Sequence, residues 1–306
     1  MSKTNTTASA LQKKRERRKN LKGYLFASPA ILGFLIFTIG PMLFSLGMSF
    51  TDYSVTGGAH FIGLDNYKNM FSGTDPYFYK ALRVTAYYVV LSVPIQIIYA
   101  FLLAILLNQK VKGLSIWRTL FYLPSIVPSV ALAMIWLWIL DPDLGLANQL
   151  LRTLGLPTSM WIYAEETVIP TLAVMSAWTA GGTTTVFLAS LKNVPGQYYE
   201  AVEIDGGNAW HKFRHITLTF MSPVLFYNII MALIGTFQVF TEAYIMTGGG
   251  PNNGSLFYVY YLYREAFSYS RLGSASAMSW VLFVIILIVT AIFFKFSDKW
   301  VYYENK

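Results

Sequence analysis

The stretch "YYEAVEIDGGNAWHKFRHITLTFMSP" (residues 198–223) lies between two long apolar runs of a 306-residue chain. It holds three carboxylates, Glu200, Glu203 and Asp205, and a Gly-Gly pair follows directly after them. Its cations come only after the glycines. Backbone and side chains this polar are costly within hydrocarbon, so we predict that the segment forms a loop at a membrane surface.

The pattern within this loop predicts two short helices joined by a tight turn. Tyr198, Ala201 and Val202 fall on one face at helical spacing. Gly206 can take the left-handed backbone conformation that a sharp reversal needs, so we expect the first helix to end there. Asn208 is a favourable N-cap for the second helix, which leads into the next apolar run.

The composition indicates an integral membrane protein. The chain is 55% hydrophobic and only 12% charged, with a mean hydropathy of +0.47. Soluble domains contain about 25% charged residues, roughly twice as many. The aromatic content of 17% suits a protein with two interfacial belts of Tyr and Trp.

Six apolar runs are long enough to cross a membrane, which takes about 20 residues. We therefore predict an all-α integral membrane protein with six transmembrane helices, forming one membrane domain over residues 24–296. A basic segment (1–23) precedes this domain, a tail (297–306) follows it, and the polar loop covers about 192–220. The six runs are 24–50, 83–107, 119–140, 168–191, 221–246 and 274–296.

Basic residues predict the orientation, because cytoplasmic loops carry an excess of Lys and Arg. With the N-terminus inside, 17 of the 23 Lys and Arg lie on the cytoplasmic side and 6 outside. Both termini and the loop at 192–220 are then cytoplasmic. The run "KKRERRKNLK" (13–22) supplies most of this bias and suits anionic lipid headgroups. It lacks both a folded nucleic-acid-binding motif and the interleaved aromatic residues that nucleic-acid binding needs.

The polar loop resembles the cytoplasmic EAA loop of permease subunits in ATP-binding cassette (ABC) importers. That pattern is Glu-Ala-Ala, two residues, Asp-Gly-Ala, and then a Phe and an Ile-x-Leu-Pro ending. Val202, Gly207 and Thr219 depart from it. The positions that match are Glu200, Ala201, Asp205, Gly206, Phe213, Ile216 and Leu218.

Further stretches extend the resemblance over most of the chain. The segment "FYLPSIVPSVALAMIWLWILDPDLGLANQLL" (121–151) is similar to the third-span region of carbohydrate-importing permeases. The segments "FQVFTEAYIMTGGGPNNGS" (237–255) and "YREAFSYSRLGSASAMSW" (263–280) are similar to their last two spans and the loop between. Together with the EAA-type loop, these segments resemble the maltose-transporter-F-like sugar permeases.

This resemblance implies the type I ABC importer permease fold and the transmembrane half of a sugar or oligosaccharide importer, in a bacterial or archaeal cell membrane. The implied partners are a second homologous permease, two cytosolic ATPase subunits, an extracytoplasmic solute-binding protein, a carbohydrate substrate and membrane lipid. The loop would dock on an ATPase subunit, with Glu200 meeting a basic residue and Gly206 making the turn. The residues implied in this coupling loop are Glu200, Ala201, Asp205, Gly206 and Gly207.

The chain itself carries no ATPase signature. No G-x-x-x-x-G-K-[ST] phosphate loop occurs, and the glycine-rich stretch 248–255 lacks the Lys that phosphate binding needs. We expect that stretch to form a turn at the outer end of the fifth span. We therefore expect no enzyme activity and no cofactor bound by this chain, with ATP and Mg used by the partner ATPase subunits. The chain has no cysteine, which excludes thiol catalysis and Cys metal sites.

Four residues of the fifth span point to a substrate path. At about 100° per residue, Asn228, Gly235, Gln238 and Glu242 fall within roughly one 80° sector of a helix. Polar residues inside spans are costly and usually face a cavity or the bundle interior. The alternative is that Asn228 and Gln238 bond other helices and that Glu242 lies at the outer interface.

The fourth span offers a second set of path residues in "AWTAGGTTT" (177–185). Trp178 is a platform on which a sugar ring can stack, Thr179 offers a hydroxyl, and Gly182 leaves room. The alternative is that the Gly and Thr residues form a surface for helix packing. No Lys, Arg or His occurs in the middle of a span, which disfavours a clamp for anionic substrates.

Two other functions, a secondary transporter and a membrane enzyme, have less support in the sequence than sugar import. A secondary transporter would show matching halves with broken helices, and Glu242 is the one membrane-buried acid that would couple an ion. A membrane enzyme would need a nucleophile motif such as G-x-S-x-G, which is absent. The alternative substrate is another polar solute such as a glycerol-phosphate compound.

Overall fold

The computed structural model describes residues 4–54, 57–109 and 112–302. Every regular element in these ranges is a helix, and only isolated bridges between extended residues occur besides. The all-α class predicted from the sequence is therefore confirmed. The side chains of residues 4–15, 17 and 18 and all of residues 303–306 are not described. Much of the predicted basic segment and the end of the tail therefore lie outside the described residues.

The first half of the chain forms the N-terminal helix, the central helix of the bundle and the broken third span. Its elements are α1 (Thr4–Phe34), the π-helical turn η1 (Leu35–Ile39), α2 (Gly40–Met48), α3 (Asp65–Phe71), α4 (Phe78–Leu107), α5 (Leu114–Tyr122), the 3-10 turn η2 (Leu123–Ile126), α6 (Ser129–Ile139) and α7 (Leu146–Thr153).

The second half forms the remaining spans and the polar loop between them. Its elements are η3 (Trp161–Tyr163), α8 (Glu165–Ala177), α9 (Gly181–Lys192), α10 (Gly196–Ile204), α11 (Ala209–His211), the π-helical η4 (Lys212–Thr217), α12 (Leu218–Phe237), η5 (Ala243–Thr247), α13 (Tyr258–Tyr263), η6 (Arg264–Ser268) and α14 (Leu272–Ser297).

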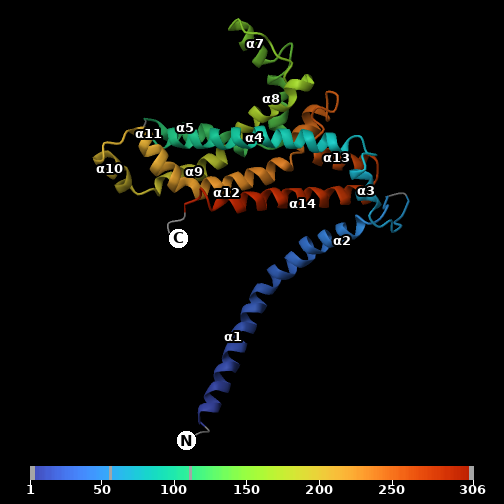
Figure 1. Ribbon diagram of the computed structural model, residues 1–306, viewed down its shortest axis with the longest axis vertical. Coiled ribbons are helices and arrows are strands. Elements are labelled where there is room, and N and C mark those ends of the chain that lie inside the picture. The colour runs from blue at the N-terminus through green and yellow to red at the C-terminus, as the bar shows by residue number, and fades with distance from the viewer. Residues whose placement is uncertain (1–3, 55–56, 110–111, 303–306) are drawn as a thin grey trace.

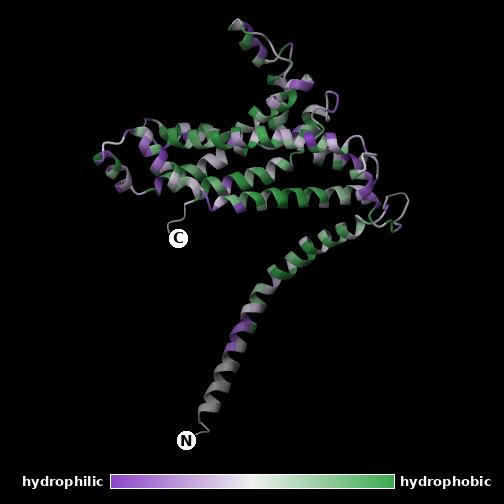
Figure 2. Ribbon diagram, in the orientation of Figure 1, coloured by the Kyte–Doolittle hydropathy of each residue, from purple (hydrophilic) through white to green (hydrophobic). Residues whose placement is uncertain are grey.

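Helix α4 is the centre of the bundle and packs against α8, α9, α12 and α13. Its buried positions recur at helical spacing, as Phe78, Ala81 and Thr85 show. Edge-to-face aromatic pairs tie it to its neighbours, with 5.9 Å between the ring centres of Phe78 and Tyr258. Because lipid is as apolar as the core, such packing, rather than escape from water, holds the helices together. Figure 2 shows α4, α12 and α14 as largely hydrophobic along their lengths.

The predicted six spans appear as four long apolar helices and two bent pairs within the described residues. The third span bends by 101° between residues 114–126 and α6, and the fourth by 46° between α8 and α9. Pro128 explains the sharper bend, because proline lacks an N–H and disfavours helical backbone at the residue before it. Val127 is accordingly extended, with ψ 132°.

The fifth span differs from the prediction of one continuous helix over 221–246. Helix α12 ends at Phe237, and the chain is not helical at Val239 and Phe240 before it turns again towards η5. The sequence contains no proline or glycine at this break, which is why its apolar pattern looked continuous. The predicted turn after the span is confirmed, since Gly248 and Gly249 both have positive φ angles of 57° and 83°.

The N-terminal arm, defined as α1, η1 and α2, extends away from the bundle (Figure 1). Its apolar part, Lys19–Met48, is long enough to span a membrane, yet none of its most apolar window is buried within the chain. A surface this apolar has to be covered by lipid or by another protein.

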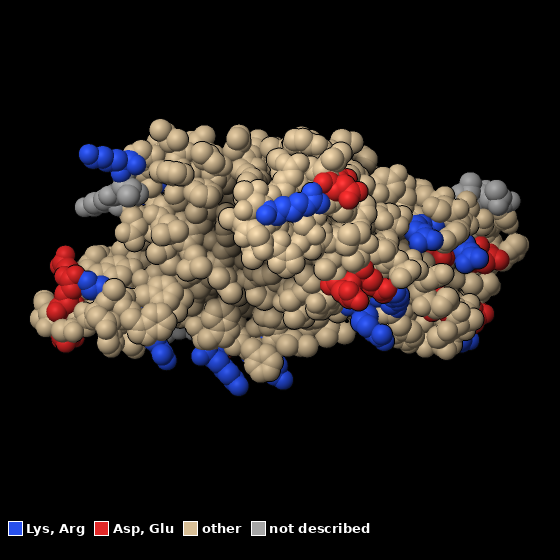
Figure 3. All heavy atoms as spheres, turned by 90° about the horizontal axis from the view of Figure 1, so that it is seen from above, with Lys and Arg blue, Asp and Glu red and all other residues tan. Residues whose placement is uncertain are grey.

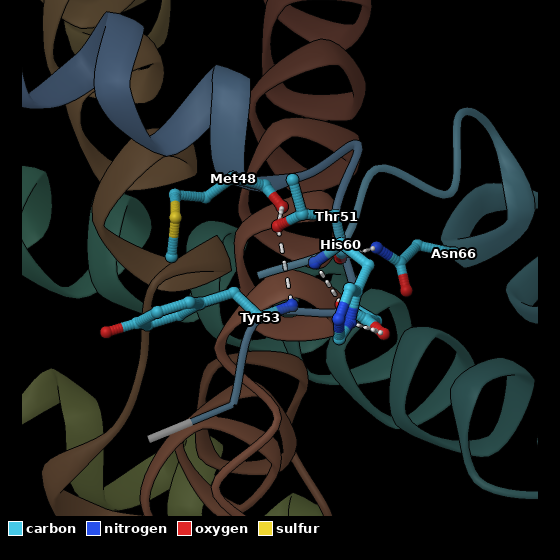
Figure 4. Close-up of polar contacts among 6 residues, drawn as sticks. Met48, Thr51, Tyr53, His60 and Asn66 are labelled. Carbon is cyan, nitrogen blue, oxygen red and sulfur yellow. Dashed lines mark hydrogen bonds and ion pairs between the residues drawn. The ribbon is translucent and has the colours of Figure 1, made fainter. Parts of the chain in front are cut away.

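The arm is joined to the bundle at one end, through the turn that follows α2 (Figure 4). The Asn66 amide donates hydrogen bonds to the carbonyls of Ser49 and Thr51, both at 2.8 Å. The Gly273 N–H donates to Tyr53 O at 3.1 Å, and a Cβ at Gly273 would lie 2.0 Å from Thr51 O. The attachment therefore depends on a glycine that lets α14 approach this turn closely.

Candidate functional site

The coupling segment, defined as residues 192–220, forms the end of the bundle at the left of Figure 1. Helix α10 runs to Ile204, a turn follows, and α11 and η4 lead without interruption into α12. The order of helix, glycine turn and helix predicted from the sequence is confirmed.

Each of the two glycines in the turn has its own physical role. Gly206 has φ +77° and donates its N–H to Glu203 O at 3.0 Å, while Gly207 donates to Val202 O at 2.8 Å. This pair of bonds is the Schellman arrangement that closes a helix at its carboxyl end. A Cβ at Gly207 would lie 2.5 Å from the Val202 side chain and 2.9 Å from its carbonyl oxygen. Gly206 is thus needed for backbone conformation and Gly207 for space.

The second half of the turn is held by a reciprocal cap. The Asn208 side chain accepts a hydrogen bond from the His211 N–H at 3.1 Å, and the Asn208 N–H donates to His211 Nδ1 at 3.3 Å. This confirms the predicted N-cap and adds a histidine where a capping box usually has Glu or Gln. Glu203 is exposed and forms an ion pair with Lys212, which joins α10 to η4.

The tip of the coupling segment combines exposed acid with exposed apolar side chains. Glu200 and Asp205 are exposed, and Figure 3 shows acidic side chains gathered at this end of the molecule, on its left. Ile204 is 87% exposed and Trp210 60% exposed on either side of the turn. A tip of this composition is suited to a groove that offers both apolar walls and a cation.

Aromatic contacts connect the coupling segment to the bundle behind it. The Tyr199 hydroxyl lies 3.1 Å from Thr217 Oγ1, and the rings of Tyr198 and Phe220 are 4.8 Å apart. On the other side of the turn, Phe213 reaches Phe101 of α4, with 6.3 Å between ring centres. A displacement of α10 is therefore passed on to α4 and α12.

A cavity of about 460 Å³ lies between α4, the α8–α9 bend and α12. Five of the seven path residues predicted from the sequence line it. They are Thr179, Asn228, Gly235, Gln238 and Glu242. A second cavity of about 250 Å³, which Thr179 and Glu242 also line, borders on α6.

The structure places Trp178 and Gly182 outside this cavity lining. Trp178 is 53% exposed and contacts the ring of Trp136 edge to face at 5.8 Å. Gly182 is exposed, with open space where a Cβ would stand. Trp178 lies in the bend between α8, which ends at Ala177, and α9, which begins at Gly181, and Gly182 follows directly after it.

The two amides of the fifth span bond to their own helix. Asn228 Nδ2 donates to Val224 O at 2.8 Å, and Gln238 Nε2 donates to Ile234 O at 3.0 Å. The alternative in which these amides bond other helices therefore has no support among the described hydrogen bonds. Each amide keeps its oxygen available to a ligand, and Gln238 also satisfies a carbonyl that the end of α12 leaves free.

Helix α4 also contributes to the cavity, which the sequence pattern of the fourth and fifth spans did not predict. Tyr88 and Gln96 line it, and Gln96 Nε2 donates to Ser92 Oγ at 2.7 Å. Ser92 in turn lies 2.7 Å from the Ser176 hydroxyl of α8. The spacing of Tyr88, Ser92 and Gln96, four residues apart, was a usable signal, since it puts three polar side chains on one face of an apolar helix. Among the described residues, no three metal-ligating side chains come together.

Comparisons with known proteins match this architecture. The family model described as "Binding-protein-dependent transport system inner membrane component" matches residues 96–302. The probable ABC transporter permease protein YesP of Bacillus subtilis is 44% identical, and the alignment covers 99% of each chain. The arabinooligosaccharides transport system permease protein AraP of the same organism is 35% identical over 92% of this chain and 90% of that one.

The fold also matches a chain of a bacterial alginate ABC transporter, solved in complex with an alginate pentasaccharide-bound periplasmic protein. The TM-score is 0.82 at 24% sequence identity, covering 93% of this chain and 96% of the other. The six-span type I permease fold expected from the sequence is thereby confirmed. The chain is a multi-pass membrane protein and not an enzyme, and it belongs to the family of binding-protein-dependent transport system inner membrane components.

Proposed function

We propose that the chain is the permease subunit of an ATP-driven importer that carries a sugar or oligosaccharide through the cavity between α4, α8–α9 and α12. The observation that carries this proposal is the cavity itself, about 460 Å³ in volume and lined by side-chain groups that hydrogen-bond. Its volume falls within the roughly 300–1,000 Å³ typical of small-molecule sites.

The chemistry of the lining favours a neutral, hydroxyl-rich substrate. Amides from Gln96, Asn228 and Gln238 stand beside the hydroxyls of Thr179 and Tyr88. None of the described lining residues is Lys or Arg, which disfavours a glycerol-phosphate compound. The relative named for arabinooligosaccharides supports a substrate of this class.

We further propose that the coupling segment docks on a cytosolic ATPase subunit. The exposed side chains of Ile204 and Trp210 fit an apolar groove, and Glu200 fits a basic residue at its edge. Charge-assisted contacts of this kind are stronger than neutral ones. ATP and Mg are bound by the ATPase subunit. Because the turn of the coupling segment is closed by its own hydrogen bonds, the ATPase subunit can displace this segment as a rigid body.

A second permease completes the translocation path in this proposal. The apolar N-terminal arm has none of its most apolar window buried within the chain, and α7 projects from the bundle at the top of Figure 1. Side chains on the bent third span, such as Met134 and Trp138, are exposed as well. Two homologous permeases, two ATPase subunits and an extracytoplasmic binding protein make up the working importer.

Uptake by reconstituted protein tests the proposal. We expect ATP-dependent uptake of a labelled arabinooligosaccharide only when this chain is reconstituted with a partner permease, ATPase subunits and binding protein. Uptake by the lone chain under an ion gradient would establish a secondary transporter instead. Reporter fusions after residues 110, 150, 205 and 260 should read inside, outside, inside and outside, as the proposed cytoplasmic termini require.

A further inference from the structure

The cytoplasmic half of the bundle contains a second cavity that the substrate path does not use. Helices α5 and α9 touch where a Cβ at Gly181 would lie 2.7 Å from Phe121 O. Beside that contact they enclose a space of about 290 Å³. Its walls include the apolar side chains of Leu107, Phe121 and Leu188. It is separate from the sugar cavity, because the two share no lining residue among those described.

One cation, Arg118 of α5, lines this cavity. Its Nη2 donates to Leu107 O at 3.1 Å and so closes the carboxyl end of α4. Its Nε is buried and, among the described residues, is the one buried side-chain nitrogen or oxygen without a hydrogen-bond partner. A buried donor left unpaired is costly, so this nitrogen calls for an acceptor from outside the chain.

The cavity lining supplies no anion for this guanidinium. None of the described lining residues is acidic, and the hydroxyls of Thr184 and Thr185 donate to carbonyls of their own helix, both at 3.0 Å. A guanidinium has five donors in a planar fork that matches the oxygens of a phosphate or carboxylate. The missing partner is therefore a bound anion.

The place of the cavity selects a lipid as the source of that anion. Leu107 is the last residue of the span α4, at the end of the bundle where the coupling segment lies (Figure 1). The end of a helix that spans the hydrocarbon core is expected near the phospholipid phosphates, and apolar walls continue from it along Phe121 and the half-exposed Tyr122. Basic pockets between transmembrane helices at this depth bind anionic headgroups.

We propose that the cavity between α5 and α9 binds an anionic phospholipid, with the headgroup phosphate on Arg118 and an acyl chain along Leu107, Phe121 and Leu188. The part of the guanidinium that lines the cavity donates to a phosphate oxygen, while Nη2 keeps its bond to Leu107 O. The lipid then bridges the end of α4 and the bent third span, next to the coupling segment.

Lipid titration of the full-length chain tests this site. The delipidated chain in a neutral detergent is titrated with phosphatidylglycerol or with phosphatidylcholine of the same acyl chains, and native mass spectrometry counts bound lipid. We expect one site that prefers phosphatidylglycerol and an Arg118→Gln variant that binds it about tenfold more weakly, the usual scale for losing a hydrogen bond between charged groups. Lys112→Gln, which removes an exposed cation of the same loop, should bind as the wild type does.

If Arg118→Gln fails to fold, Thr185→Trp provides an independent test of lipid binding in this cavity. Thr185 lines the cavity but is itself exposed, so an indole there should fill the space and block lipid while leaving Arg118 in place. Equal losses in Arg118→Gln and Lys112→Gln, or unchanged binding in Thr185→Trp, would overturn the assignment. So would displacement of the lipid by millimolar inorganic phosphate, which would make this a site for a soluble anion. The titration uses no transported sugar, so its failure is distinct from failure of the proposed import function.

Discussion

The coupling segment and the substrate cavity are neighbours along the chain, but their polar groups are held differently. In the coupling segment, the cap between Asn208 and His211 spans three positions and the ion pair between Glu203 and Lys212 spans nine. In the cavity, the amides of Gln96, Asn228 and Gln238 also bond within four positions, but the hydroxyl contact between Ser92 and Ser176 joins residues 84 positions apart.

This difference indicates which part moves as a body and which part changes shape. The coupling segment keeps its own hydrogen bonds when it is displaced, so it can transmit a push without unfolding. The cavity lining comes from α4, α6, α8, α9 and α12, so any shift of α4 against α8 or α12 changes which groups face a ligand. A transporter that alternates between two open states needs both properties.

The largest expected effect comes from breaking the local turn. Gly206→Val should abolish ATP-driven uptake, because a side chain at φ +77° costs about 1–2 kcal/mol and is worse for a β-branched residue. Gly207→Val should do the same through its clash with Val202. Uptake and co-purification of the ATPase subunit measure the loss. The control is Gly196→Ala at the start of α10, which has open space and should transport normally.

A smaller effect is expected from removing one hydrogen-bonding group of the cavity. Gln96→Ala should lower uptake about 5- to 150-fold, because an unmatched partner costs about 1–3 kcal/mol, while the complex assembles and binds its ATPase. Gln238→Ala should behave alike. Gln149→Ala, an exposed glutamine on α7, is the matched control. If Gln96→Ala instead dissociates the complex, its bond to Ser92 serves helix packing and not the substrate.

The ion pair of the coupling segment should contribute less than its turn. Exposed pairs are worth about 0–1 kcal/mol, so Glu203→Lys should reduce coupled uptake only two- to threefold. Adding Lys212→Glu should restore it, because the pair is rebuilt in reverse. Glu200 has no ion-pair partner among the described residues, so Glu200→Lys should lose ATPase binding without such a rescue. Rescue of Glu200→Lys by Lys212→Glu would show that the face of α10 that contacts the ATPase subunit is not the face that carries Glu200.

The smallest effect concerns a buried acid at the opposite end of the bundle. Burial raises the pKa of the Glu265 carboxyl, even though Arg271 lies 3.7 Å away. An acid whose pKa is higher in the folded state is neutral in both states at low pH, and it destabilises the fold as pH rises above its unfolded value of about 4.3. Glu265→Gln should therefore raise the melting temperature slightly at pH 7.5 and leave it unchanged near pH 4. A lower melting temperature at pH 7.5 would mean that the ion pair with Arg271 outweighs burial.

The coupling segment was predictable from the sequence because its determinants are local. Gly206 and Asn208 act on residues within five positions, and such rules need no knowledge of the tertiary fold. The ion pair of Glu203 was not predictable in this way, because helical periodicity alone does not report that Lys212 folds back across the turn.

The cavity was only partly predictable because it depends on where spans break. The polar stripe of the fifth span was predicted on one continuous helix, but α12 ends at Phe237, before Gln238 and Glu242. Gln96 was not predicted, because the polar stripe of the fifth span does not show which helix faces it across the cavity. Trp178 and Gly182 do not line this cavity, because they lie at the 46° bend between α8 and α9, which the apolar pattern of the fourth span does not show.

The detached N-terminal arm has a consequence for the order of biogenesis. Between Lys19 and Met48 its most apolar window has no side chain buried by the rest of the chain, and its attachment through Asn66 and Gly273 uses residues synthesised later. The most apolar part of the arm therefore needs no burial against α4 to α14 to cross the lipid, although its end still docks on α14. The ribosome can therefore deliver a finished first anchor while most of the bundle is still untranslated, and the nascent chain is tethered before its core begins to assemble.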